Sequence, residues 1–407
     1  MRTIVGTGLI ALTAVLGAGA SVAVASPATA EPARATVAPA PARELYGVSC
    51  VSSKNCVAVG TDQNAYDGRG GPLTQTWNGK TWKTSPMKLP KGAIAGQLFS
   101  VSCASATACV AVGLYLNGSD TGVPLAETWN GKGWAPSTLV TPRGSTGVEL
   151  NGVSCAGAKR CVAVGYYFTP TGAAALAESW TGGKWTTTRP PVPKGTVVGD
   201  LNKVSCASAT YCVAVGTSAT NTSGFALVDS WNGKAWAKMS AQPPASSKND
   251  ADLTGVSCTS AKSCVAVGSG TAVGGRPGGL AAFSELWNGK TWTPAKISWP
   301  KGTSDSSLVG VSCASAKSCV TVGYIDINVN DGGNTGKAAA ASWNGKAWTA
   351  TKVPAPAKGK ASLFNEVSCR SAAACVAAGQ LGPYKSTEGS GLAGIWNGKS
   401  WALVTTP

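Results

Sequence analysis

Short hydrophobic runs alternate with turn-forming residues along most of this chain, and the same order of runs returns at a nearly constant interval. In the second repeat, residues 97–103 have the pattern of a strand, and residues 109–113 form another after five small or polar positions. A third run ends at Trp129, and a fourth that carries Trp134 follows an Asn-Gly turn. Each repeat is therefore predicted to form four antiparallel strands.

Cysteines mark the repeat most clearly, because the frame V-S-C-x5-C occurs seven times and uses all 14 cysteines. The first cysteines of successive pairs lie 53, 52, 51, 52, 55 and 56 residues apart. A period near 50 residues with four strands per unit predicts an all-β fold, a seven-bladed β-propeller with one hairpin disulfide in each blade. The predicted disulfides are Cys50–Cys56, Cys103–Cys109, Cys155–Cys161, Cys206–Cys212, Cys258–Cys264, Cys313–Cys319 and Cys369–Cys375.

Metal binding and redox catalysis are the other uses of paired cysteines. Zinc sites favour shorter spacings and a second ligand pair, and this chain has no histidine. No C-x-x-C motif is present, which argues against redox chemistry. We therefore expect neither a metal nor a cofactor. A loop this short contributes roughly 2 kcal/mol per bridge, so the bridges hold the register of the hairpins more than they create the fold.

The fourth strand follows an Asn-Gly turn in six of the seven repeats, and the third repeat has Thr-Gly-Gly instead. Asn-Gly between two strands favours a two-residue type I′ turn. Such a turn places Trp77 opposite Lys80, and Gln75 opposite Trp82, so the two tryptophans become diagonal neighbours. Fourteen of the 15 tryptophans occur in these pairs, which we interpret as packing between blades rather than as platforms for sugars.

The start of the chain predicts export. Arg2 precedes an apolar run over residues 4–24, and small-residue cleavage sites follow, so residues 1–30 are predicted to be a secretory signal peptide cut after Ala25 or Ala30. A membrane anchor is the alternative, and the Gly/Ala content and cleavage sites disfavour it. Residues 31–43 are rich in Pro and Ala, and are predicted to be a disordered leader. The propeller is predicted to occupy residues 44–407, with repeats starting near residues 44, 97, 149, 200, 252, 307 and 363.

The order Val-Ser-Cys, Val-Ala-Val-Gly and then T/S-W-N-G-K-x-W resembles the neuraminidase-type, Asp-box-like repeats of secreted propellers. This order of motifs is closest to the cysteine-paired repeats of proteins that actinobacteria secrete, and the resemblance covers residues 44–407. The resemblance implies an architecture and no particular activity. An Asp-box reads S-x-D-x-G-x-T-W; when its tryptophan is aligned with Trp82, Trp77 stands where the aspartate belongs. No sialidase residue can therefore be carried over to this chain.

Function is expected where the repeats differ. In a four-stranded blade, the loops between the second and third strands share one face with the connections between blades, and both vary here in length and content. The connections carry basic residues next to a glycine, and the net charge is +16, so a basic ring that attracts polyanions is one interpretation; turn chemistry and solubility are the other. The candidate ligand-binding residues are Lys91, Arg143, Lys194, Lys301, Lys358, Trp299, Tyr115, Tyr166 and Tyr324.

Catalysis is less favoured than binding. The absence of histidine and of unpaired cysteine excludes Ser-His-Asp and Cys-His chemistry. Glycoside hydrolysis needs two positioned carboxylates. Four carboxylates recur two residues before the first tryptophan of a pair, opposite the second one in the predicted register, and we interpret them as structural. They are Glu127, Glu178, Asp229 and Glu285.

Three functions remain open. The first is a secreted, extracellular, non-catalytic propeller that binds cell-wall or environmental polysaccharide, with an anionic polymer as one option. The second is a glycoside hydrolase or lyase on the same scaffold, and the third is an extracellular scaffold for protein partners. We expect a monomer without a membrane span in its mature form. Export and the lack of a reader motif argue against specific binding of nucleic acid.

Overall fold

The computed structural model describes residues 43–63, 69–85, 87–245, 250–272, 279–327, 336–355, 360–382 and 389–407. The chain divides into a unit of residues 1–40 and a unit of residues 41–407, and all the described residues belong to the second. The predicted signal peptide and residues 31–42 of the predicted leader lie outside the described residues, whereas Arg43 already begins the first strand.

The described residues form 28 strands, which occur as seven consecutive sets of four. The first strands of the repeats are β1 (Arg43–Ser52), β5 (Ala93–Ser105), β9 (Val148–Gly157), β13 (Val198–Ser208), β17 (Asp252–Ser260), β21 (Thr303–Ser315) and β25 (Ala361–Ser371). The second strands are β2 (Asn55–Asp62), β6 (Ala108–Asn117), β10 (Arg160–Thr169), β14 (Tyr211–Ala219), β18 (Ser263–Thr271), β22 (Ser318–Ile327) and β26 (Ala374–Gly382).

The third strands are β3 (Gly71–Trp77), β7 (Gly122–Trp129), β11 (Gly172–Trp180), β15 (Gly224–Trp231), β19 (Leu280–Trp287), β23 (Lys337–Trp343) and β27 (Ser390–Trp396). The fourth strands are β4 (Trp82–Ser85), β8 (Trp134–Pro136), β12 (Trp185–Thr188), β16 (Trp236–Met239), β20 (Trp292–Ala295), β24 (Trp348–Thr351) and β28 (Trp401–Thr405). The predicted division of each repeat into four antiparallel strands is confirmed.

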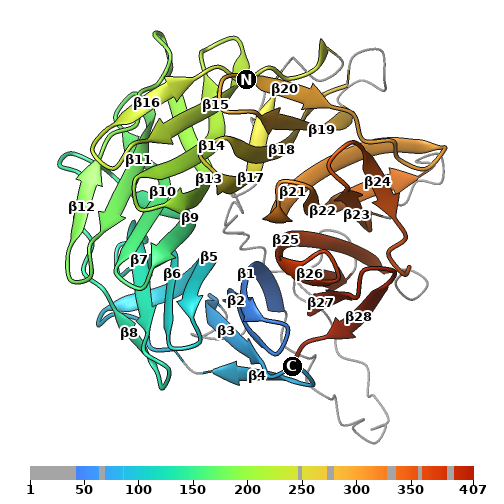
Figure 1. Cartoon of the computed structure of the whole chain (residues 1–407). Helices are drawn as coiled ribbons and strands as arrows, with labels where there is room; N and C mark the ends of the chain where they lie inside the picture. The colour runs from blue at the N-terminus through green and yellow to red at the C-terminus, as the bar shows by residue number, and fades with distance from the viewer. Residues whose placement is uncertain are drawn as a thin grey trace, which may run out of the picture. The chain divides into compact units, whose positions relative to one another are not determined.

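The strands assemble into six sheets, five of four strands and one of eight strands that contains β9 to β16. A single parallel bridge between Ala173 and Val198 joins the two halves of the larger sheet. At the corresponding junction of the first and second repeats, a backbone hydrogen bond joins the Gly96 nitrogen to the Gly70 oxygen at 3.2 Å. The first strand of each repeat contacts the first strands of the repeats before and after it, and β1 also contacts β25. Figure 1 shows the sheets following one another in chain order within this unit.

The middle of each second strand is mostly apolar because neighbours cover both of its faces. Val57 and Val59 on β2 pack with Leu98 of the second repeat, while Ala58 between them packs with Val376 of the seventh repeat. Successive side chains of a strand point to opposite faces, so V-A-V supplies both interfaces of one sheet. The hydrophobic core is therefore divided into clusters between successive repeats, and the last repeat packs on the first.

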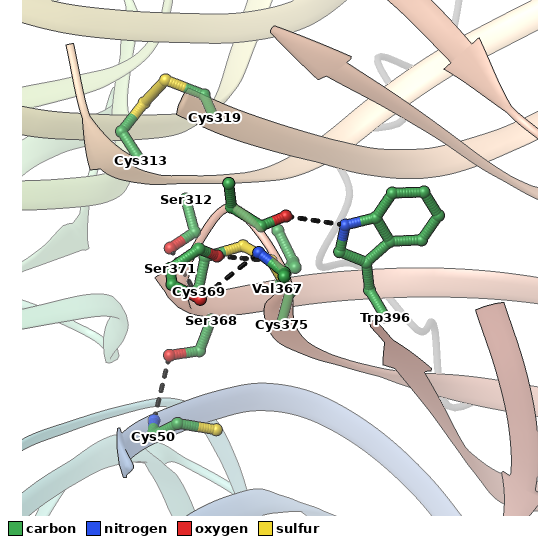
Figure 2. The surroundings of a disulfide bond; sticks show 12 residues. Cys50, Ser312, Cys313, Cys319, Val367, Ser368, Cys369, Ser371, Cys375 and Trp396 are labelled. Atoms are coloured by element: carbon green, nitrogen blue, oxygen red, sulfur yellow. Dashed lines mark hydrogen bonds between the residues drawn. A yellow bond between two sulfur atoms is a disulfide. The ribbon is translucent and has the colours of Figure 1, made fainter. Parts of the chain in front are cut away.

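All seven predicted disulfides are present. The serine before each first cysteine has a role that the sequence did not reveal: its Oγ accepts a hydrogen bond from the first cysteine nitrogen of the next repeat, at 2.9–3.0 Å. The series ends with Ser368 accepting from Cys50, as Figure 2 shows beside the Cys369–Cys375 disulfide. The first and last repeats thus meet without exchanging a strand.

The predicted type I′ turn is wrong. Trp77 pairs directly with Trp82, and the four residues between them form the loop. The Asn78 side-chain oxygen accepts hydrogen bonds from the Lys80 and Thr81 nitrogens, both at 2.9 Å, and only Gly79 within this loop has a positive φ, of 94°. An asparagine side chain that closes its own turn makes a second residue with positive φ unnecessary.

The corrected register brings the tryptophan rings together, and the ring centroids of Trp77 and Trp82 lie 5.4 Å apart. The first tryptophan of a pair also secures the cysteine loop, since the Trp396 indole nitrogen donates to the Ala372 oxygen at 3.0 Å (Figure 2). In the third, fourth and seventh repeats the second one reaches the preceding repeat, as when the Trp185 indole nitrogen donates to Ser137 Oγ at 2.9 Å. These contacts support the structural interpretation of the tryptophan pairs.

Candidate functional site

The repeats present two different ends. At one end the cysteine loop and the Asn-Gly turn lie together, since a Cβ atom on Gly79 would come within 2.8 Å of Lys54 Cγ. At the other end, the start of each first strand pairs with the end of the second strand, as Ala93 does with Asn117. The connections between repeats and the loops between second and third strands meet there. We call this end the variable face.

Four of the five predicted basic candidates occupy the same position on this face, and Lys358 lies outside the described residues. Each follows a proline whose oxygen accepts a hydrogen bond from the nitrogen three residues later, at 3.1–3.2 Å. The following glycines have φ of 80–88°, which is the geometry of a type II turn. The turn accounts for the proline and the glycine, but it leaves the basic side chain free to vary. The four residues are exposed and form no ion pair within the described ranges: Lys91, Arg143, Lys194 and Lys301.

The predicted aromatic candidates are more enclosed. Tyr166 is 7% exposed, and its hydroxyl donates to Glu149 at 3.0 Å. Trp299 is half-buried and packs against the core cluster between the fifth and sixth repeats. Tyr115 and Tyr324 are also half-buried. The structure therefore does not bring these four side chains together into one exposed group.

The first strands carry a cluster of carboxylates; the sequence placed Asp200 and Asp252 on the variable face but did not indicate that they form a group with Glu149. Glu149, Asp200 and Asp252 occupy the same position on β9, β13 and β17, six residues before the first cysteine of each repeat, and Glu44 stands there in the first repeat. The constant spacing of six residues before the first cysteine is the signal by which these carboxylates could have been found in the sequence. Asparagines two residues later link neighbouring repeats by short hydrogen bonds. Asn151 donates to Asp200 at 2.9 Å, and Asn202 donates to Asp252 at 2.8 Å.

Burial changes the ionisation of this cluster. It raises the pKa of Glu149 to about 7, although the hydrogen bond from Tyr166 acts in the opposite direction. The pKa of Asp200 is raised well above its ordinary value, first by burial and then by the negative charges of Glu149 and Asp252. Glu149 can therefore hold a proton near neutral pH, which is a property of acids that take part in proton transfer.

An ion pair links opposite sides of the ring formed by the first strands. Lys203 on β13 lies 2.9 Å from Glu366 on β25, and their side chains are 15% and 16% exposed. The fourth and seventh repeats are not neighbours along the ring, so this contact crosses its centre. Such a pair is sensitive to the loss of either partner, because the remaining charge stays largely buried.

The four recurring carboxylates of the third strands lie between repeats, away from solvent. Glu127 pairs with Pro136 rather than with the second tryptophan, which follows from the corrected turn. Glu178 accepts from Thr187 at 2.7 Å, but neither oxygen of Glu127 or of Asp229 has a hydrogen-bond partner in the described part of the chain. Burial raises the pKa of each of the four, Glu285 included, to about 7. Their position supports the structural interpretation.

A hollow of about 260 Å³ lies on the opposite face, between the second and third repeats. Its walls include Trp129, Trp180, Lys159 and Thr107. None of the predicted ligand-binding residues lines it, so it forms no part of the candidate site on the variable face.

The chain was compared with known proteins. No family model and no curated protein matches it, so the resemblance to actinobacterial repeats stays a prediction. Among solved structures it is similar to the GH74 xyloglucanase from Xanthomonas campestris, with a TM-score of 0.56, 12% identity, and coverage of 90% of this chain and 55% of that one. It therefore spans about half the length of the xyloglucanase.

Two further structures are similar over 90% of this chain. One is a PL25 ulvan lyase, with a TM-score of 0.54, 8% identity and 93% of that chain covered. The other is the β-propeller domain of the Trilobed protease from Pyrococcus furiosus, with a TM-score of 0.52, 8% identity and 96% of that chain covered. No apolar helix of membrane-spanning length occurs where the structure is described. At these identities the similarity shows the fold alone, which is a β-propeller built from repeated four-stranded sheets, each repeat with its own disulfide.

Proposed function

We propose that residues 43–407 form a seven-bladed β-propeller that is secreted and binds an anionic polysaccharide through its variable face. Support for seven blades comes from the repeat itself, since each set of four strands has its own disulfide. We interpret the eight-stranded sheet as two blades, because only the bridge between Ala173 and Val198 joins its two halves. At the equivalent junction between the first and second repeats, a backbone hydrogen bond takes the place of this bridge.

Support for secretion comes from the predicted signal peptide and from the disulfides, which persist in oxidising compartments. Expression of the full chain in a secreting host tests this part. Protein recovered from the medium should begin after Ala25 or Ala30. Retention of all the protein inside the cells, with its first residues intact, would contradict it.

The observation that carries the binding proposal is the position of the cations on the variable face. Lys91, Arg143, Lys194 and Lys301 are exposed, occupy the same turn in four connections, and have no ion-pair partner in the described ranges. Cations gathered on one surface concentrate polyanions near it. Because the turn does not require a basic residue at this position, its repetition supports a role for the charge.

Retention on immobilised polygalacturonate and on neutral cellulose, measured at increasing salt concentration, tests the proposal. We expect retention on polygalacturonate that weakens steeply with salt. The triple variant Lys91→Gln, Lys194→Gln, Lys301→Gln should lose most of it. A matched variant removes three lysines from the cysteine loops of the opposite face, and it should be retained like the unchanged protein. Those lysines are Lys54, Lys262 and Lys317.

Equal loss in both triple variants would mean that only net charge matters, and the variable face would then have no special role. Failure of the unchanged protein to bind any polymer would overturn the polysaccharide proposal and direct the search to protein partners.

A second candidate function, a hydrolase or lyase, is favoured by one observation. Glu149, Asp200 and Asp252 form a coupled group of carboxylates, and Tyr166 donates to Glu149. Prolonged incubation with the retained polymer, followed by assay for new reducing ends and for unsaturated products, tests it. Products that vanish in Glu149→Gln would support catalysis, and the absence of products from the unchanged protein would rule it out for that polymer.

A further inference from the structure

Large hydrophobic side chains are exposed at four positions of the described structure, and all four lie in the second to fourth repeats or the connections between them. Their exposed fractions are 54% for Val140, 43% for Phe168, 39% for Val192 and 47% for Phe225. A single exposed apolar side chain is common on protein surfaces. Two exposed phenylalanines at one interface between repeats are more than a single exposed side chain, so this general tendency does not explain them.

Phe168 and Phe225 project from facing walls of the interface between the third and fourth repeats. On β10, Phe168 lies on the same side as Val164, which packs against the fourth repeat. On β15, Phe225 lies on the same side as Leu227, which belongs to the same core cluster. The two rings therefore stand at the variable-face end of one interface, above its buried part.

Val192 packs into the same interface from the connection between these repeats. A Cβ atom on Gly199 would lie 2.8 Å from Val192 Cγ1, and Gly199 pairs with Ser218 on the side of β14 that faces the third repeat. We call Phe168, Val192 and Phe225 the aromatic site.

One cation lies beside the aromatic site in the same connection: Lys194 is two residues beyond Val192 and is exposed. The Arg189 guanidinium lies 6.0 Å from the centre of the Tyr167 ring, which points to the opposite side of β10 from Phe168 and packs with the second repeat, so Arg189 does not belong to the site. One carboxylate, Asp250, lies at the Phe225 end, where it accepts a hydrogen bond from the Gly224 nitrogen at 3.2 Å. Lys194 is therefore the cation beside the site that can pair with an anionic group.

No other interface between repeats has two aromatic residues at these positions. The strand register identifies the equivalents of Phe168 and Phe225 in each repeat, and these equivalents are small, polar or aliphatic. In chain order the pairs are Gln63 with Val123, Leu116 with Ala174, Ala219 with Ala281, Thr271 with Lys337, Asp326 with Ser390, and Gly382 with Gly71. Comparison of the repeats at these two positions could have found the site from the sequence.

We infer that the aromatic site is a subsite that receives the apolar C–H face of one sugar ring, while Lys194 binds an acidic group of the same anionic chain. The inference rests on the proposed function and deepens it. Ligand sites combine apolar and aromatic surface with a few polar groups that fix orientation. Two phenylalanine rings with a neighbouring cation match a sugar acid, which has an apolar ring face and a charged edge.

Calorimetric titration with a hexamer of galacturonate tests the subsite, with the neutral hexamer cellohexaose as a second probe. The double variant Phe168→Ser, Phe225→Ser should bind the galacturonate hexamer about tenfold more weakly than the unchanged protein, because it loses the ring contacts. Val140→Ser is the matched control, since it removes an exposed apolar side chain outside this interface. It should bind like the unchanged protein. Lys194→Gln should weaken binding of the galacturonate hexamer and leave binding of cellohexaose unaltered.

The outcomes separate the two proposals. If the unchanged protein binds neither the hexamer nor polygalacturonate, the proposed function fails and the subsite fails with it. If the unchanged protein binds and the phenylalanine variant binds equally well, only the subsite is overturned. Thermal unfolding shows whether the variant is folded. If it is not, the methyl NMR signals of Val192 in the unchanged protein decide: a shift on addition of the hexamer supports the subsite, and unchanged signals overturn it.

Discussion

Replacement of Glu127 by glutamine should stabilise this protein at alkaline pH. Glu127 is 0% exposed, and neither of its carboxylate oxygens has a hydrogen-bond partner within the described residues. Burial raises its pKa from 4.5 to about 7, because the charged form cannot be solvated between the repeats. The position accepts an amide, since Gln75 occupies it in the first repeat and donates to the Pro407 oxygen at 2.6 Å.

The direction in which stability changes with pH follows from the direction of the pKa change of Glu127. A carboxyl group with a higher pKa in the folded state binds its proton more tightly there than in the unfolded chain. Its contribution to stability is complete below pH 4.5 and is lost as the pH rises through about 7. A rise from 4.5 to about 7 corresponds to a loss of up to about 3 kcal/mol above pH 7. The glutamine variant lacks this loss.

Denaturant unfolding of the unchanged protein and of Glu127→Gln, measured from pH 4 to pH 8, gives the difference between their free energies of unfolding at each pH. We expect similar stability near pH 4 and a variant that is more stable by as much as about 3 kcal/mol near pH 8. Repulsion among the many cations largely cancels in this difference. Asp120→Asn is the control, because it removes an exposed carboxylate on a surface turn. A variant that gains nothing between pH 4 and pH 8 would refute the assignment of a buried, protonated Glu127.

Three further predictions concern the contacts within and between repeats. Loss of one disulfide in Cys103→Ser, Cys109→Ser should reduce the free energy of unfolding by about 2 kcal/mol, and no reduction would mean that the bridge does not restrict the unfolded chain. Ser102→Ala should cost about 1 kcal/mol, because the Cys155 nitrogen loses its acceptor; unaltered stability would show that water replaces it. Lys203→Met should cost about 3 kcal/mol of unfolding free energy, because it leaves Glu366 buried without its partner. The double variant Lys203→Met, Glu366→Leu should recover most of that loss. Equal losses of stability in the single and the double variant would refute the ion pair. Urea unfolding at neutral pH measures all three.

Much of the local structure could be predicted from the repeated pattern. The period and the apolar runs indicated four strands per repeat, and the spacing within each cysteine pair indicated a hairpin disulfide, both of which the structure confirms. The Asn-Gly turn was predicted wrongly, because the side chain of Asn78 closes the loop and shifts the pairing to Trp77 with Trp82.

The candidate site was predicted less well than the fold. Lys91, Arg143, Lys194 and Lys301 were found because they recur in one motif, and the structure places them on the variable face. Phe168 and Phe225 were missed, since their importance depends on the register of strands in two different repeats. A search for recurring residues cannot find a site that exists at only one interface.

The sequence by itself determined the repeat, its four strands and its disulfides, because these depend on contacts between residues close along the chain. Only the tertiary structure decided how repeats meet, because those contacts join residues about 50 positions apart or more. The contact of Ser368 with Cys50 and that of Lys203 with Glu366 belong to this second class, and so does the position of Phe168 and Phe225 on strands of adjacent repeats. The local sequence pattern determines where each strand forms, and the packing of neighbouring repeats determines which side chains come together.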